Sequence, residues 1–316
     1  MNNFNTPILF LIFNRLDTTK QVFEIIRQVK PSRLYLASDG PRDSKEGETE
    51  KVNIVREHVI NSIDWNCDVK TLFRDKNLGC GIAVSDAITW FFKNEEMGVI
   101  LEDDCLPSLS FFSFCEELLI KYKDNERIFH IAGNNSLTLT SIPCSYFFTR
   151  IMHCWGWASW RRAWINFNYN ISNLNDFIKQ KKINTIFKRN VDREHWVDIF
   201  KNIENPKNDI WDYQWCYSIY NNNGICIIPY KNLITNIGIG TEETHPCPIP
   251  KDFEFQERFD ILEIIHPEEI IINNKLTNLI NKNIYNIKFS FLRIIKKIIK
   301  NIIGQKLSSK IKYYLK

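Results

Sequence analysis

The sequence lacks the signals that place a protein outside the cell or across a membrane. Its first thirteen residues, MNNFNTPILFLIF, have no basic segment before the apolar run, so they do not resemble a secretory signal. No apolar stretch reaches the roughly 18 residues that a membrane-spanning helix needs. The nine cysteines include no CxxC pair, which argues against a zinc ribbon and a thioredoxin-like motif. We therefore expect a cytoplasmic protein with reduced, buried thiols.

Acidic residues are absent from the last part of the chain. From Lys275 onward there are eleven Lys and Arg residues and no Asp or Glu, whereas the rest has a net charge of −7. Within 286–303, apolar residues recur at helical spacing, and most basic residues fall elsewhere on the helix. This predicts a basic amphipathic helical tail whose residues 284–316 bind an anionic membrane surface at its inner face. The alternative is a helix that packs on its own domain or on a partner chain. Nucleic acid fits less well, because the apolar face is large and the body is acidic.

Hydrophobic residues make up 44% of the chain, a share that allows a sizeable core. Over the first half, short apolar runs alternate with segments of helical spacing. We expect strands at 7–13, 33–38, 68–73 and 97–101, and helices at 17–29, 48–63, about 81–92 and 108–122. Asp17 or Thr18 is the expected N-cap of the first helix. This order predicts an α/β fold with a mostly parallel sheet flanked by helices.

The second half is more mixed, and no internal repeat is visible. Strands are expected at 128–133, 145–149 and 225–229, a Trp-rich turn and helix at 154–164, and further helices at 174–203 and 211–221. A loop rich in Gly, Thr and Pro is expected at 236–250.

Polar residues follow three of the predicted parallel strands. They are Asn14-Arg15, Ser38-Asp39-Gly40 and Glu102-Asp103-Asp104. Ligands of open α/β sheets bind beyond the carboxyl ends of the strands, so these residues are expected to converge on one crevice.

Three successive carboxylates at a strand end repel one another unless a cation or hydrogen-bond donors lie nearby. Carboxylate oxygens are hard ligands that suit Mn²⁺ or Mg²⁺, and a nucleotide diphosphate supplies further ligands to the same ion. The alternative interpretation of Glu102-Asp103-Asp104 is a solvated acidic turn.

The run GVILEDDCLPSLSFFSFCEELLIKY resembles the metal-binding segment of GT-A fold glycosyltransferases. It is most similar to the inverting N-acetylglucosaminyltransferase I family and to related bacterial sugar transferases. The resemblance is specific at 97–115 and diffuse over the rest of 7–245. It implies a GT-A fold, with Asp104 as the metal ligand and Asp103 and Glu102 as donor contacts.

Other donor-binding residues are implied by the same resemblance. Asn14 and Arg15 match the family's nucleotide contact after strand one, and Asp39 falls where the family places an Asp on the uracil of the donor. Gly79, within Asn77-Leu78-Gly79-Cys80-Gly81, resembles the loop before the helix beneath the nucleotide, although a plain turn explains these glycines as well.

An inverting transferase needs a general base near the acceptor hydroxyl. The family carries an Asp in a Trp-Asp-Asp-Trp type segment, and here Trp211–Trp215 holds a single Asp at a different spacing. Asp212 is the expected base and Asp209 the alternate. The competing interpretation is that Asp212 caps a helix.

Three more residues are candidates for the acceptor or for a loop over the donor. Trp157 lies in the Trp-Gly-Trp turn, and Arg161, followed by Arg162, comes directly after it. His245 ends the Gly-rich segment that starts at Asn236. The alternatives are a core tryptophan, solvated helix charges and an ordinary loop.

Together these residues predict a metal-dependent hexosyl- or N-acetylhexosaminyl-transferase of the inverting kind. Its donor is a nucleotide-diphosphate sugar, UDP-sugar favoured, and its acceptor a glycan or lipid-linked glycan of surface polysaccharide synthesis. We expect a domain at 1–250, with a nucleotide-binding half at 1–125 and an acceptor half at 126–250, and a tail at 251–316. A sugar-nucleotide pyrophosphorylase is disfavoured because FLIFNRLDTTK contains no Gly-rich phosphate loop. A non-catalytic membrane-surface or glycan-binding protein of the same fold is the remaining alternative.

Overall fold

The computed structural model describes residues 4–137, 139, 143–203, 208–239, 256–285 and 287. Its helices and strands follow in the order β1 (Ile8–Ile12), α1 (Leu16–Val29), β2 (Arg33–Ser38), α2 (Glu48–Asn61), β3 (Asp68–Phe73), α3 (Cys80–Asn94), β4 (Met97–Glu102), β5 (Cys105–Pro107), α4 (Leu109–Lys121), β6 (Ile128–Ala132), β7 (Tyr146–Thr149), β8 (Trp157–Trp160), α5 (Arg161–Trp164), α6 (Leu174–Lys179), α7 (Ile183–Ile186), α8 (Asn190–Asn202), α9 (Asp212–Asn221), β9 (Ile225–Pro229), β10 (Ile234–Asn236) and α10 (Asn274–Asn283).

The described strands form an eight-stranded sheet in the order β3-β2-β1-β4-β8-β6-β9-β7 and a two-stranded sheet of β10 and β5. Strands β3, β2, β1 and β4 are parallel, and β6 and β9 are parallel to each other. Strand β8 is antiparallel to both β4 and β6, and β7 is antiparallel to β9. The prediction of an α/β fold with a mostly parallel sheet is therefore confirmed.

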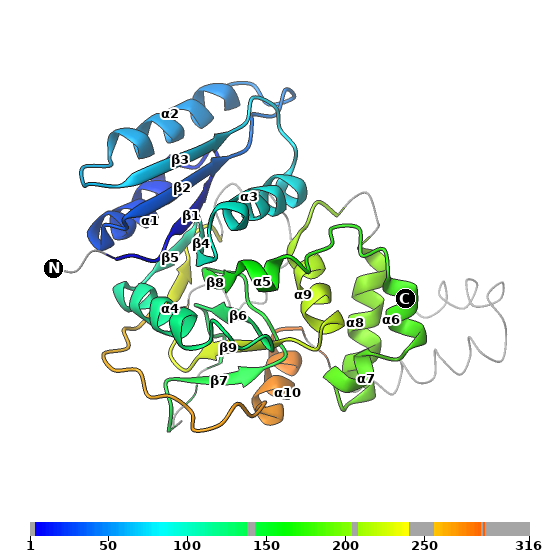
Figure 1. Ribbon diagram of the computed structural model, residues 1–316. Coiled ribbons are helices and arrows are strands. Elements are labelled where there is room, and N and C mark those ends of the chain that lie inside the picture. The colour runs from blue at the N-terminus through cyan, green and yellow to red at the C-terminus, as the bar shows by residue number, and fades with distance from the viewer. Residues whose placement is uncertain are drawn as a thin grey trace.

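Side chains of β1 alternate between the two faces of the sheet, and all of them are buried. Ile8, Phe10 and Ile12 belong to the core that includes residues of α1, α2 and α4. Leu9 and Leu11 belong to the opposite core, which includes residues of α3, α5 and α9. Figure 1 shows helices on both faces of the sheet, as the uninterrupted apolar run of β1 requires.

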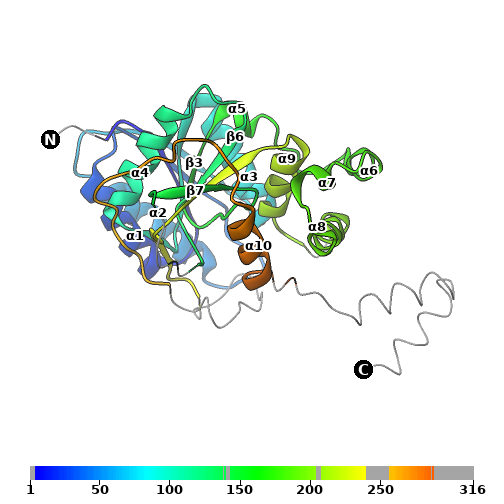
Figure 2. The ribbon, with the colours of Figure 1, turned by 90° about the horizontal axis from the view of Figure 1, so that it is seen from below.

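Helices α6, α7 and α8 form a group on one side of the molecule, with α9 between this group and the sheet (Figures 1 and 2). Aromatic side chains join them: Phe177 of α6 and Phe200 of α8 both pack on Tyr217 of α9. The segment predicted as helices with polar linkers at 174–203 contains three helices, the short α6 and α7 and the longer α8.

The Trp-rich segment differs from its prediction as a turn and helix. Residues 157–160 form strand β8, inserted between β4 and β6, and only the short α5 follows. All four residues of β8 are buried. Packing within the folded sheet, rather than the local sequence pattern that predicted a turn and helix, therefore determines this strand. The N-cap prediction was also wrong, since α1 begins at Leu16 and Arg15 is its N-cap.

The predicted tail at 251–316 is described only at 256–285 and 287. This part lies against the sheet: Ser145 N–H donates to Ile265 O at 2.8 Å, and Asn273 N–H donates to Phe148 O at 2.8 Å. The basic amphipathic segment from 288 onward lies outside the described residues. In the described part of the chain, no helix has the length and apolar character needed to cross a membrane.

Candidate functional site

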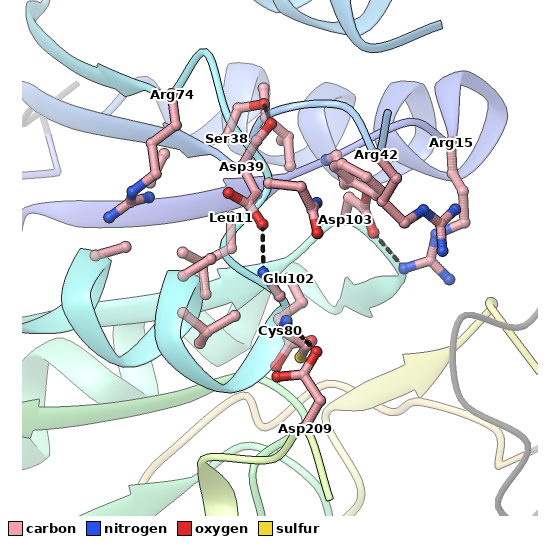
Figure 3. Close-up of a pocket in the computed structure, with 18 residues that line it drawn as sticks. Leu11, Arg15, Ser38, Asp39, Arg42, Arg74, Cys80, Glu102, Asp103 and Asp209 are labelled. Carbon is pink, nitrogen blue, oxygen red and sulfur yellow. Dashed lines mark hydrogen bonds and ion pairs between the residues drawn. The ribbon is translucent and has the colours of Figure 1, made fainter. Parts of the chain in front are cut away.

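A pocket lies at the carboxyl ends of β1, β2 and β4 (Figure 3). Strand β1 stands between β2 and β4, so the chain order reverses there, which is where open α/β sheets bind their ligands. Residues from all three strand ends line the pocket, among them Arg15, Asp39, Glu102 and Asp103. The structure thus brings together the three polar segments expected to converge.

Arg15 joins two of the three successive carboxylates. Its guanidinium lies 2.6 Å from Asp103 Oδ1 and 3.1 Å from Asp104 Oδ2. Asp103 Oδ2 also accepts from the Phe13 amide at 3.2 Å, so its buried carboxylate is held on both oxygens. Asp104 is more accessible, with 14% of its side chain exposed. Glu102 and Asp103 line the pocket, whereas Asp104 lies outside its lining and has the more exposed carboxylate of the two aspartates.

Negative charge exceeds positive charge at this strand end. Burial, with the neighbouring Asp104 and Asp103 carboxylates, raises the pKa of Glu102 to about 8. Burial also raises the pKa of Asp103 to about 6, although Arg15 opposes the shift. A cation bound here would relieve this repulsion.

The acidic triplet fits a divalent cation that takes few ligands from the protein. Among the described residues, no group of three or more His, Cys, Asp or Glu side chains is placed to hold a metal. Mg²⁺ is commonly bound by one or two carboxylates together with substrate phosphates and water. Asp104, partly exposed in the turn between β4 and β5, is the carboxylate that would take that role.

The start of the predicted Gly-rich loop lies beside Asp104. Strand β10 pairs with β5, and the Ile237 amide donates to Asp104 O at 2.8 Å. A Cβ added at Gly238 would lie 2.4 Å from Asp104 Oδ2 and 2.7 Å from an Arg15 guanidinium nitrogen. Only glycine fits at this position without displacing the two side chains. His245, at the end of the predicted loop, lies outside the described residues.

Asp39 lies in the pocket and holds the loop before α3. Its carboxylate accepts from the Leu78 amide at 3.0 Å and the Gly79 amide at 3.1 Å. Gly79 has a φ of +83°, a backbone conformation that side chains other than glycine rarely adopt. Burial raises the pKa of Asp39, and the loop amides oppose that rise. Asp39 and Gly79 therefore form one unit of the pocket wall.

Asn14 turns toward a buried glutamate that the sequence pattern did not reveal. Its side-chain amide donates to Glu48 Oε1 at 2.9 Å, and Arg42 forms an ion pair with the same carboxylate. The Arg42 guanidinium lowers the pKa of Glu48. Arg42 and Arg74 both line the pocket, and each follows a strand. Asp39 was selected because it is a polar residue that follows a predicted strand, and the same criterion would have selected these two arginines.

Asp209 binds the first turn of α3 from a distant part of the chain. Its carboxylate accepts from the Cys80 amide at 2.7 Å and from the Gly81 amide at 2.6 Å. A carboxylate at a helix N-terminus satisfies amides that have no partner within the helix. Asp209, the alternate candidate for the base, thus caps a helix that lines the pocket.

We expect Asp209→Ala to lower the free energy of unfolding by about 1–2 kcal/mol, because two α3 amides lose a charged acceptor. Asp209→Asn keeps one acceptor oxygen and should lose about half as much. Urea unfolding followed by circular dichroism measures both, with Asp176→Ala, an exposed acid in the first turn of α6, as the control. A loss in Asp209→Ala no larger than that of the control would contradict the capping role.

Asp212 is the first residue of α9, and Trp211 is the N-cap. Asp209 lines the pocket at the strand ends, but Asp212 does not. Asp212 lies three residues further along the chain and lines a second pocket. Asp212 is still close enough to the acidic triplet for its negative charge to raise the pKa of Glu102. The segment 209–212 therefore stands between the two pockets.

Trp157 and Arg161 lie away from both pockets. Trp157 is fully buried in β8, stacked between His130 and Trp211. Trp160, the last residue of β8, pairs with Met97, the first residue of β4, so the chain reaches the edge of the sheet opposite the crevice. There Arg161 donates to Phe92 O at 2.6 Å. Arg162 stacks over the Trp160 ring at 4.3 Å.

The fold and the pocket define an α/β protein with a candidate ligand pocket at its strand ends. No family model matches the sequence, and no curated protein matches it. Among solved structures, apo UDP-glucose pyrophosphorylase is similar at 11% identity and a TM-score of 0.36, over 74% of this chain and 93% of that one. HddC from Yersinia pseudotuberculosis complexed with GMP-PN is similar at 13% identity and a TM-score of 0.28, over 41% of this chain and 60% of that one.

The complex of UDP-glucose pyrophosphorylase with UDP-glucose is similar at 12% identity and a TM-score of 0.25. The match covers 46% of this chain and 62% of that one. At these identities and scores, the similarity assigns no activity to the chain.

Proposed function

We propose that the protein is a metal-dependent glycosyltransferase of the GT-A type that transfers a sugar from a nucleotide-diphosphate donor to a glycan or lipid-linked acceptor. One observation supports the proposal: the Glu102-Asp103-Asp104 carboxylates follow β4 at the switch point of the sheet, Glu102 and Asp103 line the first pocket, and Asp212 lines a second one. A transfer between two bound molecules needs a place for each of them.

The residues of the first pocket would hold the donor. Arg15 and Arg74 bring positive charge to the diphosphate and nucleotide, and the α3 N-terminus with Gly79 offers a close backbone approach. Asp39 would accept from the N3–H of uracil, which would favour UDP-sugars. Asp104 would hold Mn²⁺ or Mg²⁺, which would supply Lewis-acid stabilisation of charge on the leaving diphosphate. Asp103 forms an ion pair with Arg15, and Glu102 would face the sugar end of the donor.

Asp212 would act as the general base of an inverting transfer. The acceptor hydroxyl oxygen attacks C1 of the donor sugar, the bond from C1 to the diphosphate oxygen breaks, and the nucleoside diphosphate leaves with the electron pair. The hydroxyl proton passes to the Asp212 carboxylate. A positioned base contributes about 10²–10⁴-fold to such a step. Gly238 lies beside Asp104, and His245, outside the described residues, is proposed as a further phosphate or metal contact.

Product analysis tests this assignment against the pyrophosphorylase alternative. Wild-type protein is incubated with Mn²⁺ and a panel of UDP-, GDP-, CMP- and dTDP-sugars, and products are followed by phosphorus NMR. We expect slow, metal-dependent release of a nucleoside diphosphate by hydrolysis of one donor. Formation of a nucleoside triphosphate after pyrophosphate is added would instead identify a pyrophosphorylase and overturn the proposal.

The basic segment at the end of the chain is proposed to bring the enzyme to an anionic membrane surface, close to a lipid-linked acceptor. We expect deletion of residues 288–316 to abolish binding to vesicles that contain phosphatidylglycerol and to leave donor hydrolysis unchanged. The deletion spares Ile287, which is 3% exposed and whose amide donates to Asn281 O at 3.1 Å. Vesicle sedimentation at low salt measures the effect, with neutral phosphatidylcholine vesicles as the control. Equal binding by the shortened protein would contradict the membrane role.

A further inference from the structure

Residues 256–273, the arm, pass along the outside of α4 on their way to α10 (Figures 1 and 2). Near the start of α4, the Ser110 amide donates to Asp260 Oδ1 at 3.1 Å. About two turns further along the same helix, Glu117 Oε1 lies 2.9 Å from His266 Nε2. The arm and α4 therefore run side by side in the same direction, and their exposed side chains form what we call the arm–α4 face.

Large apolar side chains are concentrated on these two segments. Six of the eleven that are exposed in the described part of the chain belong to the arm or to α4: Leu109, Ile120, Phe259, Leu262, Ile265 and Ile271. Leu262 is 100% exposed, whereas its neighbour Ile261 packs against the core. Single exposed apolar residues are normal, but a group of them marks a binding surface.

The arm–α4 face also carries an excess of negative charge. The arm contains five acidic residues and one arginine, and all five acids are exposed: Glu257, Asp260, Glu263, Glu268 and Glu269. On α4, the exposed Glu117 and Lys121 offset each other. Such a face repels anionic lipid and nucleic acid, whereas a basic amphipathic segment complements both its charge and its apolar side chains.

The chain itself contains a segment of that kind. Residues 288–316 hold nine Lys and Arg residues and no Asp or Glu. They follow α10, which begins directly after the arm, so they leave the body within about 15 Å of the arm's end. The amphipathic pattern of 286–303 corresponds to a helix about 27 Å long, enough to cover the 13 residues of α4, which span about 20 Å.

We propose that residues 288–316 bind the arm–α4 face of the same molecule, with their Lys and Arg side chains beside the exposed acids and their apolar side chains over Leu262 and Ile265. The contact does not depend on any enzymatic activity. One consequence rests on the membrane role in the proposed function: an anionic surface has to compete with this face for the basic segment. Membrane binding is then weaker than that of a free segment.

Carbodiimide cross-linking of the full-length protein tests the contact, because the reagent joins a carboxylate and a lysine amine that touch. We expect cross-links within the monomer from lysines of 288–316 to acids of the arm–α4 face. These cross-links should be lost at about 1 M salt, where the screening length falls to about 3 Å. Mass spectrometry of the digested protein identifies the joined residues.

The variant Leu262→Ser/Ile265→Ser removes two exposed apolar side chains and keeps every carboxylate, so it should lower the cross-link yield about tenfold. Ile54→Ser/Ile60→Ser, on the exposed side of α2, is the matched control and should cross-link like the wild type. No cross-link to the face in the wild type, or an equal yield in Leu262→Ser/Ile265→Ser, would overturn the inference. Cross-links confined to dimers would assign the face to a second copy of the chain and would also overturn it.

Sedimentation with phosphatidylglycerol vesicles separates this proposal from the membrane role. Leu262→Ser/Ile265→Ser should bind the vesicles about threefold or more tightly than the wild type, because its basic segment is no longer held. Weaker binding by this variant would mean that the arm–α4 face itself enters the membrane, which contradicts the proposal. Cross-links without vesicle binding by either protein would support the contact and contradict only the membrane role.

Discussion

Replacing Asp104 by alanine should weaken metal-dependent binding of the nucleotide-sugar by about 100-fold or more. Substitution of a group that only supports a metal ligand already costs 10–100-fold in many sites, and Asp104 is proposed to touch the ion itself. The substitution also frees Arg15 from one of its two carboxylates, while the shorter contact with Asp103 remains. The pocket should therefore keep its shape. Titration calorimetry with Mn²⁺ and the preferred donor measures the loss.

Glu96→Ala is the matched control for this variant. Glu96 is an exposed acid beside the opposite end of β4, just before Met97. It should leave both donor affinity and metal dependence as they are. Donor affinity in Asp104→Ala that equals the wild type, with Mn²⁺ still required, would show that the ion binds elsewhere.

Asp212→Asn should reduce the rate of sugar transfer by about 10²–10⁴-fold and leave the affinity for the donor within about twofold. Asparagine keeps the size and a polar oxygen at the start of α9 but does not take a proton. Because Asp212 lines a different pocket from Arg15 and Asp39, the donor contacts remain. Single-turnover transfer to a panel of methyl glycosides of glucose, galactose and N-acetylglucosamine measures the rate.

The competing view is that Asp212 merely stabilises the first turn of α9. Under that view, Asp212→Asn costs a few tenths of a kcal/mol and leaves the rate of transfer unchanged. Asp176→Asn, in the first turn of α6, removes a comparable helix charge away from the pockets. A transfer rate in Asp212→Asn like that of Asp176→Asn would exclude Asp212 as the base.

Strands β1, β2 and β4 were predictable because nearly all of their side chains are buried, on both faces of the sheet. Such strands appear in the sequence as apolar runs, and the predicted bounds 33–38 match β2. The predicted bounds 68–73 also match β3, although β3 is an edge strand whose side chains are exposed or half-buried. The pocket followed from one further rule, that polar residues after parallel strands meet at one edge of the sheet. Arg15, Asp39 and Glu102 were located together on that basis.

Contacts between segments far apart in the chain could not be predicted from the sequence pattern. The link from Asp209 to the Cys80 amide spans 129 positions, and no local signal marks it. Arg161 follows the Trp turn in sequence, yet β8 runs antiparallel to β4 and carries it to the opposite edge of the sheet.

Metal-dependent donor binding is the central claim, and a thermal-shift screen of UDP-, GDP-, CMP- and dTDP-sugars with and without Mn²⁺ tests it most directly. A ligand that binds only the folded protein raises the melting temperature by mass action. We predict a rise for one nucleotide class, UDP-sugars first, that requires Mn²⁺ and is lost in Asp104→Ala. The absence of a shift with every donor, in the presence of the metal, would contradict the transferase assignment.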